Sequence, residues 1–208
     1  MTHAESDADG SDWAPCNKFS IGSKAPVLIA IDLAFDENTQ KITLTHPDRP
    51  TLTIDPNHDS DAFIDWVTPL MPANRAASAR LVKAQTRGMT DTDYPSISIG
   101  NLASHRDVCA KLGQDISIKR WRGNIWLDGL NPWQEFDWIG KSIRIGSVTF
   151  DVKEPVRRCM ATTANPTTGI RDADTLKALN SWGHQNFNVY AIATSDGAIK
   201  RGDTLEVL

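Results

Sequence analysis

The sequence lacks the patterns that mark several large classes of protein. Only three of its 208 residues are cysteine (Cys16, Cys109 and Cys159), and they form neither a paired framework nor a Cys-x-x-Cys motif. This usage excludes a disulfide scaffold and favours a reducing compartment. No apolar run approaches the length of a membrane span, and the acidic, polar residues 1–7 do not form a signal or transit peptide. We therefore expect a cytoplasmic protein with no membrane partner.

Common catalytic and nucleotide-binding motifs are also missing. The chain has no G-x-G-x-x-G motif, P-loop, H-E-x-x-H motif or G-x-S-x-G elbow, and its five histidines are scattered. His105 and His184 remain as isolated candidates for acid–base groups, although an isolated histidine more often lies at the surface or satisfied in the core. The net charge of -4 argues against a nucleic-acid partner.

Short strand patterns dominate the remaining sequence. Residues 41–45 and 51–54 alternate with period two around a turn at 46–50, which predicts a hairpin. Asn101 is expected to cap a helix over 102–111 that Gly113 ends, and a buried face of this helix would hold Cys109. Asp172 or Asp174 is expected to cap a short helix over 175–179, and residues 61–70 have a helical pattern. Further strands are expected at 27–31, 81–84, 97–99, 116–118, 124–127, 143–145, 148–152, 188–193 and 204–207.

These patterns predict a mainly β (α+β) chain, with a barrel-like β fold and only a few short helices. Residues 1–24 are polar and rich in serine, aspartate and glycine, so we expect a flexible N-terminus. A first β subdomain is expected over 25–79, and a second, larger domain over 80–208.

Cys159 lies in the most informative stretch of the chain, between Arg158 and a run of hydroxyl side chains that includes Thr162 and Thr163. Nearby guanidinium charge favours the thiolate, the form that binds soft metals and takes part in sulfur transfer. The alternative is that Cys159 simply packs in the core, as free cysteines often do.

Ordered motifs in the second half resemble the MOSC domain, the fold named after the C-terminal domain of molybdenum cofactor sulfurase. The resemblance rests on segments 120–129 (RWRGNIWLDG), 138–146 (WIGKSIRIG) and 158–169 (RCMATTANPTTG), and on the closing segment 202–207 (GDTLEV). It implies a MOSC-type β-barrel over 80–208, preceded by a partial N-terminal β subdomain.

Within that family, the R-C-x-x-T-T form of residues 158–163 resembles the mitochondrial amidoxime-reducing component and its bacterial relatives. The resemblance implies that Cys159 is the protein ligand to the molybdenum of a pterin (molybdopterin) cofactor and the central catalytic residue. It also implies a set of residues that contact the cofactor or line its site: Arg122, Asn124, Arg158, Thr162, Thr163, Ser98, Asn101 and Ser104.

Two departures from the family pattern stand out. Asn165 occupies a position where an acidic residue is common. The amidoxime-reducing relatives also begin with motifs that this sequence does not contain, so we expect that Met1 is an internal methionine of a longer reading frame.

Three functions follow from this reading. The first is an oxidoreductase, or its catalytic component, that reduces small N-hydroxylated substrates with electrons from a separate donor, either a reductase or an iron–sulfur or haem protein. The second is a sulfur carrier that uses a Cys159 persulfide, with pyridoxal phosphate supplied only by a partner. The third is an inactive, truncated fragment.

Overall fold

The computed structural model describes residues 1–208, and its chain divides into two compact units. The first unit holds residues 1–93 and also 163–172, and the second holds residues 94–162 and 173–208. The ten residues 163–172, which follow the Cys159 segment, therefore belong to the first unit, and the chain returns to the second unit at residue 173. The expected domain boundary near residue 80 stays a prediction.

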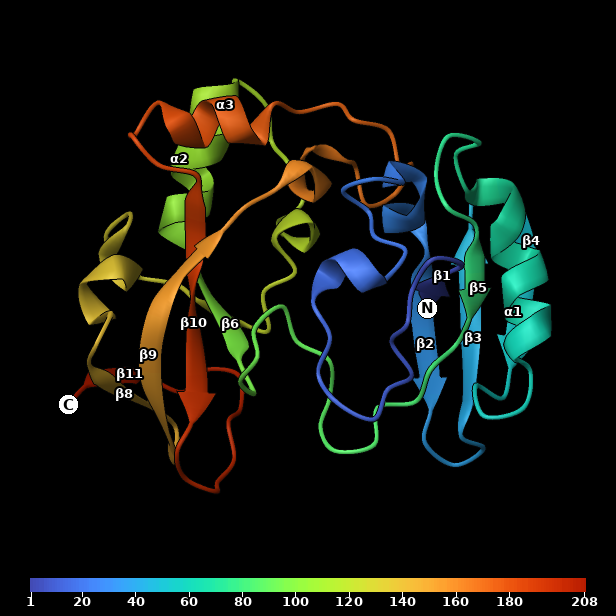
Figure 1. The fold of residues 1–208 in the computed structure, drawn as a ribbon. Coiled ribbons are helices and arrows are strands. Elements are labelled where there is room, and N and C mark those ends of the chain that lie inside the picture. Colours follow the sequence, from blue (N-terminus) through green and yellow to red (C-terminus); the bar gives the residue numbers. More distant parts are fainter. The chain divides into compact units, whose positions relative to one another are not determined.

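The first unit is built on a three-stranded antiparallel sheet in the order β2 (Asp32–Asp36), β3 (Lys41–His46) and β4 (Arg49–Ile54). The helix α1 (Ser60–Val67) continues into a 3₁₀ turn, η3 (Thr68–Leu70), and packs beside β4 (Figure 1). The expected hairpin and helical segment are therefore both present. Their shared core contains Leu44, Ile54, Phe63, Trp66, Val67 and Leu70.

The N-terminal residues, which we expected to be flexible, contribute a strand. β1 (Thr2–His3) pairs antiparallel with β5 (Ser78–Arg80). The Thr2 side chain is fully buried, and its hydroxyl donates to the carbonyl oxygen of Arg80 at 3.3 Å. A 3₁₀ turn, η1 (Cys16–Lys18), follows. Pairing with a strand far along the chain is what holds this polar segment in place.

Three strand predictions are wrong. The apolar run at 27–31 forms a 3₁₀ helix, η2 (Pro26–Ala30), because Pro26 fixes a helical φ and has no N–H for a sheet ladder. Residues 81–84 lie outside any strand, and residues 116–118 lead into another 3₁₀ helix, η4 (Ile118–Trp121).

The second unit contains one curled, half-barrel sheet of six strands, with a few short helices (Figure 1). Neighbouring strands are antiparallel except for the last pair, which is parallel. The expected fold class is confirmed in this form. In sheet order the strands are β11 (Leu205–Val207), β8 (Ser142–Ile145), β9 (Val148–Arg157), β10 (Asn186–Ala193), β6 (Ile97–Asn101) and β7 (Ile125–Leu127).

Both helices of this unit begin where cap chemistry predicts, and α2 also ends there. The side chain of Asn101 accepts from the N–H of Ala103 at 2.9 Å to start α2 (Leu102–Leu112), and Gly113 ends it with a left-handed φ of 68°. Asp174 accepts from the N–H of Lys177 at 3.0 Å and starts α3 (Thr175–Asn180).

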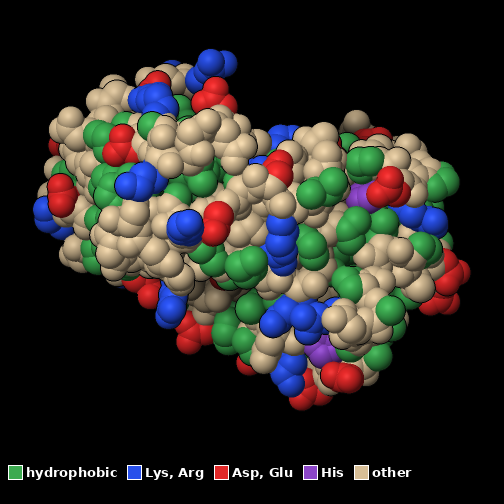
Figure 2. All heavy atoms as spheres, turned by 90° about the horizontal axis from the view of Figure 1, so that it is seen from above, with side chains coloured by type: hydrophobic (Ala, Val, Ile, Leu, Met, Phe, Trp, Pro, Cys, Tyr) green, Lys and Arg blue, Asp and Glu red, His purple; other side chains and the backbone are tan.

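Apolar side chains on the two faces of the curled sheet form two clusters. One lies among β6, β8, β9 and β10, and the other lies under α2 and α3. No helix is long and apolar enough to cross a bilayer. On the face drawn in Figure 2, basic and acidic side chains are interspersed.

Candidate functional site

Cys159 lies on a turn at the end of β9, and hydrogen bonds hold its main chain. The N–H of Arg158 donates to the carbonyl oxygen of Gln185 at 2.8 Å. The N–H and the hydroxyl of Thr162 both donate to the carbonyl oxygen of Cys159, at 3.2 and 3.1 Å. Since the Thr162 hydroxyl has only one proton, it accepts from Thr175 across the 2.7 Å contact. The thiol of Cys159 is exposed, so the turn presents sulfur on a fixed backbone.

Arg158 ties this turn to the rest of the unit. Its Nε donates to the carbonyl oxygen of Phe187, and its Nη1 donates to that of Trp121, both at 2.8 Å. The guanidinium also lies 5.9 Å from the centre of the Trp121 ring, which stacks on Phe187 at 4.0 Å. A planar fork of donors suits two fixed carbonyls. Its predicted contact with a cofactor stays a prediction, and the structure shows in addition that Arg158 positions the turn.

A second arginine-rich turn lies beside the first. η4 ends at Trp121, and Arg122 follows in the left-handed region at φ 52° with an exposed side chain. Arg120, by contrast, is buried, and its Nη1 lies 3.5 Å from the carbonyl oxygen of Thr162. Arg120 and Arg158 therefore join the 120–122 segment to the Cys159 turn by hydrogen bonds to main-chain carbonyls. Arg122, in contrast, presents an accessible positive charge.

Ser98 and Asn124 form a matched pair next to this turn. The Oδ1 of Asn124 accepts from the N–H of Ser98, and the N–H of Asn124 donates to the carbonyl oxygen of Ser98, both at 2.8 Å. The Ser98 hydroxyl accepts from Nδ2 of Asn188 at 2.9 Å. Because Asn188 directly follows Phe187, the residue that binds Arg158, the structure brings Ser98, Asn124 and Arg158 together through β10.

Asn101 and Ser104 belong to a different network, which sequence reasoning missed. Both side chains donate to Oε2 of Glu135, at 2.8 and 2.9 Å, and the N–H of Trp133 donates to the Ser104 hydroxyl at 2.7 Å. Asn101, Ser104 and Glu135 are all fully buried. Burial raises the pKa of Glu135, more than these hydrogen bonds lower it. Glu135 lies in a polar, aromatic segment, η5 (Gln134–Trp138), where nothing in the sequence distinguishes it from a surface acid.

Thr163 and Asn165 lie in the loop of residues 163–172, which belongs to the first unit. The Thr163 hydroxyl accepts from Nη1 of Arg171 at 2.6 Å. The Nδ2 of Asn165 donates to Asp172 at 2.7 Å, and its Oδ1 accepts from the N–H of Thr167 at 2.8 Å. The amide at 165, where the family pattern often has an acid, therefore closes the loop on itself. An acid at this position would meet Asp172 with like charge.

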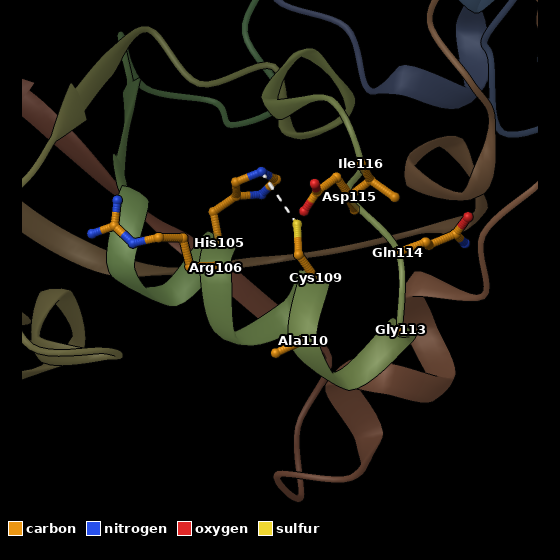
Figure 3. Close-up of a pocket in the computed structure, with 8 residues that line it drawn as sticks. All are labelled: His105, Arg106, Cys109, Ala110, Gly113, Gln114, Asp115 and Ile116. Carbon is orange, nitrogen blue, oxygen red and sulfur yellow. Dashed lines mark hydrogen bonds between the residues drawn. The ribbon is translucent and has the colours of Figure 1, made fainter.

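Cys109 occupies a separate place in the second unit. It lines a surface cavity of about 660 Å³ between the end of α2 and residues 113–116 (Figure 3). Its sulfur lies 3.5 Å from Nε2 of His105, whose Nδ1 accepts from the indole N–H of Trp121 at 3.0 Å. An indole can only donate, so the ring proton of neutral His105 lies on Nε2. Burial lowers the pKa of His105, and it also lowers the pKa of His184. His105 also hydrogen-bonds to the backbone of Ile116, which acts to raise its pKa. Cys109 is buried on the helix, as expected.

The chemistry of the donors at Cys159 restricts what the site can hold. No group of three or more histidine, cysteine or acidic side chains in the chain is arranged to hold a metal ion. A metal at Cys159 would therefore have fewer than three such protein ligands, which suits a metal that an organic cofactor carries. The exposed cation of Arg122 suits an anionic group such as a phosphate. The residues present fit a molybdenum–pterin cofactor in these two respects.

Comparison with known proteins identifies the family of the chain. The sequence model of the MOSC domain matches residues 89–206, more than half of the chain, and the chain therefore belongs to the MOSC domain family. It is similar to molybdenum cofactor sulfurase of Drosophila grimshawi, with 34% identity over 118 residues that cover 56% of this chain and 15% of that one. It is also similar to molybdenum cofactor sulfurase of Anopheles gambiae, with 31% identity over 86 residues, 40% of this chain and 11% of that one.

The chain thus spans about a seventh of the length of these curated relatives or less. Among solved structures, the crystal structure of YiiM from Geobacillus stearothermophilus aligns with a TM-score of 0.42 and 18% identity, over 54% of this chain and 53% of that one.

Proposed function

We propose that this chain binds the molybdenum cofactor through the thiolate of Cys159 and reduces N-hydroxylated compounds. One observation carries the proposal. The structure presents the exposed thiol of Cys159 on a turn whose main chain is bound on both sides, by Arg158 and by Thr162. A thiolate held in this way is a ligand for a soft or high-valent metal, and fixed geometry around it is what a metal site needs.

Other residues would hold the cofactor around that sulfur. Arg122 would pair with its phosphate, and Asn124 would contact the pterin from the same turn. Arg158 would not reach out to the cofactor with the two donors that bind Phe187 and Trp121, and its role is to keep Cys159 in place. Bound at Cys159, the cofactor would supply two-electron chemistry at an oxygen atom.

The overall reaction would break the N–O bond of the substrate. An N-hydroxylated compound takes up two electrons and two protons, and yields the reduced nitrogen compound and water. The two electrons would come from a separate donor protein, since the sequence has no flavin or haem motif. The exposure of Cys159 leaves the site open to a small-molecule substrate.

The direct test is reduction of an aromatic N-hydroxylated amidine by cofactor-loaded protein, with chemically reduced methyl viologen as electron donor. We expect wild-type turnover, and loss of at least 100-fold in the Cys159→Ser variant. Cys109→Ser is the matched control, because Cys109 packs against His105 on a helix and not on the Cys159 turn. Absence of turnover in a wild type that contains molybdenum would refute the reductase proposal.

A sulfur-carrier function is the second candidate, favoured by the name of the similar proteins, molybdenum cofactor sulfurase. The Cys159 thiolate would attack the outer sulfur of a partner's persulfide, forming a Cys159 persulfide and releasing the partner's thiol. Pyridoxal phosphate, if involved, would belong to that partner. Incubation with a persulfide donor followed by cyanide would release thiocyanate from wild type and not from Cys159→Ser. This function predicts thiocyanate release without molybdenum.

A further inference from the structure

Asn188 combines a left-handed backbone with a fully buried polar side chain. It lies in β10, where the pairing with β9 shifts register between Asn186 and Val189. Its backbone φ is 68°, in the left-handed region that favours glycine, and its side chain is fully buried. Strained residues of this kind persist where their surroundings hold them, and they gather at functional sites. Asparagine tolerates this conformation better than other residues with a side chain.

The amide of Asn188 fills a space that two glycines leave open. An added Cβ on Gly100 would lie 2.7 Å from Oδ1 of Asn188, and one on Gly123 would lie 3.0 Å from its Nδ2. The Trp126 ring crowds the same two glycines, at 2.8 and 3.0 Å from the added atoms. The Oδ1 has no hydrogen-bond partner, whereas Nδ2 donates to the Ser98 hydroxyl. The close fit therefore needs glycine at both positions and a planar amide between them.

The neighbours of this amide belong to the Cys159 site. Gly123 lies between Arg122 and Asn124, and Ser98 is bound to Asn124 by two hydrogen bonds. Phe187, the residue before Asn188, accepts from Arg158. The bulge in β10 thus contacts the 122–124 turn with a side chain and the Cys159 turn with a carbonyl group.

We propose that Asn188 is a positioning residue that fixes the 122–124 turn in place beside Cys159. Glycine at 188 would adopt the same backbone without strain, but it would lose the bond to Ser98 and the contact with Gly123. The proposal rests on the proposed function, because it is the cofactor that requires Arg122 and Asn124 to be held in place. Asn188 itself is fully buried.

Hydrogen exchange of the Asn188→Gly variant, measured residue by residue by NMR without cofactor, tests the positioning role. We expect the N–H groups of Ser98 and Asn124 to exchange about tenfold faster, as loss of one buried hydrogen bond implies. The amides that pair β8 with β9 should change by less than about twofold. Gln40→Gly is the matched control, because Gln40 also has a left-handed φ, of 58°, on an exposed turn.

A second variant, Ser98→Ala, removes the acceptor and keeps Asn188, and should also speed exchange of the Asn124 N–H several-fold. Unchanged local exchange in both variants would overturn the proposal whatever the cofactor content. Pterin retention, measured by fluorescence after release, should fall several-fold in Asn188→Gly, and unchanged retention alongside faster exchange would also overturn it. Absence of pterin from wild type would instead refute the proposed function, and the exchange result would still decide the role of Asn188.

Discussion

Replacing Arg158 should destabilise the second unit far more than replacing the arginine next to it. In Arg158→Met, the carbonyl groups of Phe187 and Trp121 each lose a charged donor at 2.8 Å. Both carbonyls belong to fully buried residues. An unsatisfied buried acceptor costs about 1–3 kcal/mol, so two of them predict a loss of about 2–4 kcal/mol once partial access of water is allowed. Methionine keeps the apolar stem of the side chain over Trp121.

The matched comparison is Arg157→Met. Arg157 is exposed, so we expect a change within about 0.5 kcal/mol. Arg158→Lys should fall between the two, at about 1–2 kcal/mol, because one ammonium cannot reproduce a planar fork that binds two carbonyls.

Native-state hydrogen exchange of the β8–β9 amides measures unfolding of this unit, independently of the first unit. A loss below about 1 kcal/mol in Arg158→Met, or equal losses in Arg157→Met and Arg158→Met, would refute the role of Arg158 as the anchor of the Cys159 turn.

Three further predictions concern the surrounding structure. Burial raises the folded pKa of Glu135. The contribution of this carboxyl to stability is therefore full below its unfolded pKa of about 4.3, and it is lost as pH rises through the folded pKa. Denaturation of wild type and Glu135→Gln between pH 4 and 8 should show wild type losing stability relative to the variant. A constant difference across that range would contradict a raised pKa. Asn101→Ala should cost about 2–4 kcal/mol in denaturant, because it removes the α2 cap and one of two donors to Glu135, and a cost near that of a surface mutation would contradict this network. Gly169→Ala should destabilise the first unit by about 2 kcal/mol or more, since φ is 71° and the added Cβ would lie 2.5 Å from the Cα of Val27. Hydrogen-exchange rates of the β3–β4 amides equal to those of wild type would contradict this close contact.

Elements with local chemical signals could be predicted from the sequence. Asn101 and Gly113 delimit α2 because a cap side chain and a left-handed glycine act within a few residues of their own positions. The hairpin of β3 and β4 likewise follows from alternation around a short turn. Family motifs at 120–129, 138–146 and 158–169 indicated the fold of the second unit.

Features that depend on distant partners could not be predicted. The run at 27–31 is apolar and rich in β-branched residues, as a buried strand would be. It forms a 3₁₀ helix because Pro26, directly before it, favours a helical start over a strand. β2 was missed because its apolar residues, Leu33 and Phe35, are exposed at 56% and 50% and lie between acids.

The candidate site shows the same division. The motif singled out Cys159, but it could not show that Arg158 binds main-chain carbonyls of residues 29 and 37 positions away along the chain. It also could not show that Asn101 and Ser104 meet the buried carboxyl of Glu135, since that acid reads as a surface residue. The left-handed Asn188 has no local signal, because asparagine is common in ordinary loops as well.

The central claim is that Cys159 is the protein ligand of a molybdenum–pterin cofactor. Its most direct test is elemental analysis for molybdenum, with fluorescent detection of the released pterin, on protein produced in a host that makes the cofactor. Wild type, Cys159→Ser and Cys109→Ser would be compared at equal folded concentration. We predict near-stoichiometric molybdenum and pterin in wild type and in Cys109→Ser, and loss of both from a folded Cys159→Ser. Equal molybdenum in wild type and Cys159→Ser would contradict the claim, as would equal loss from the two cysteine variants.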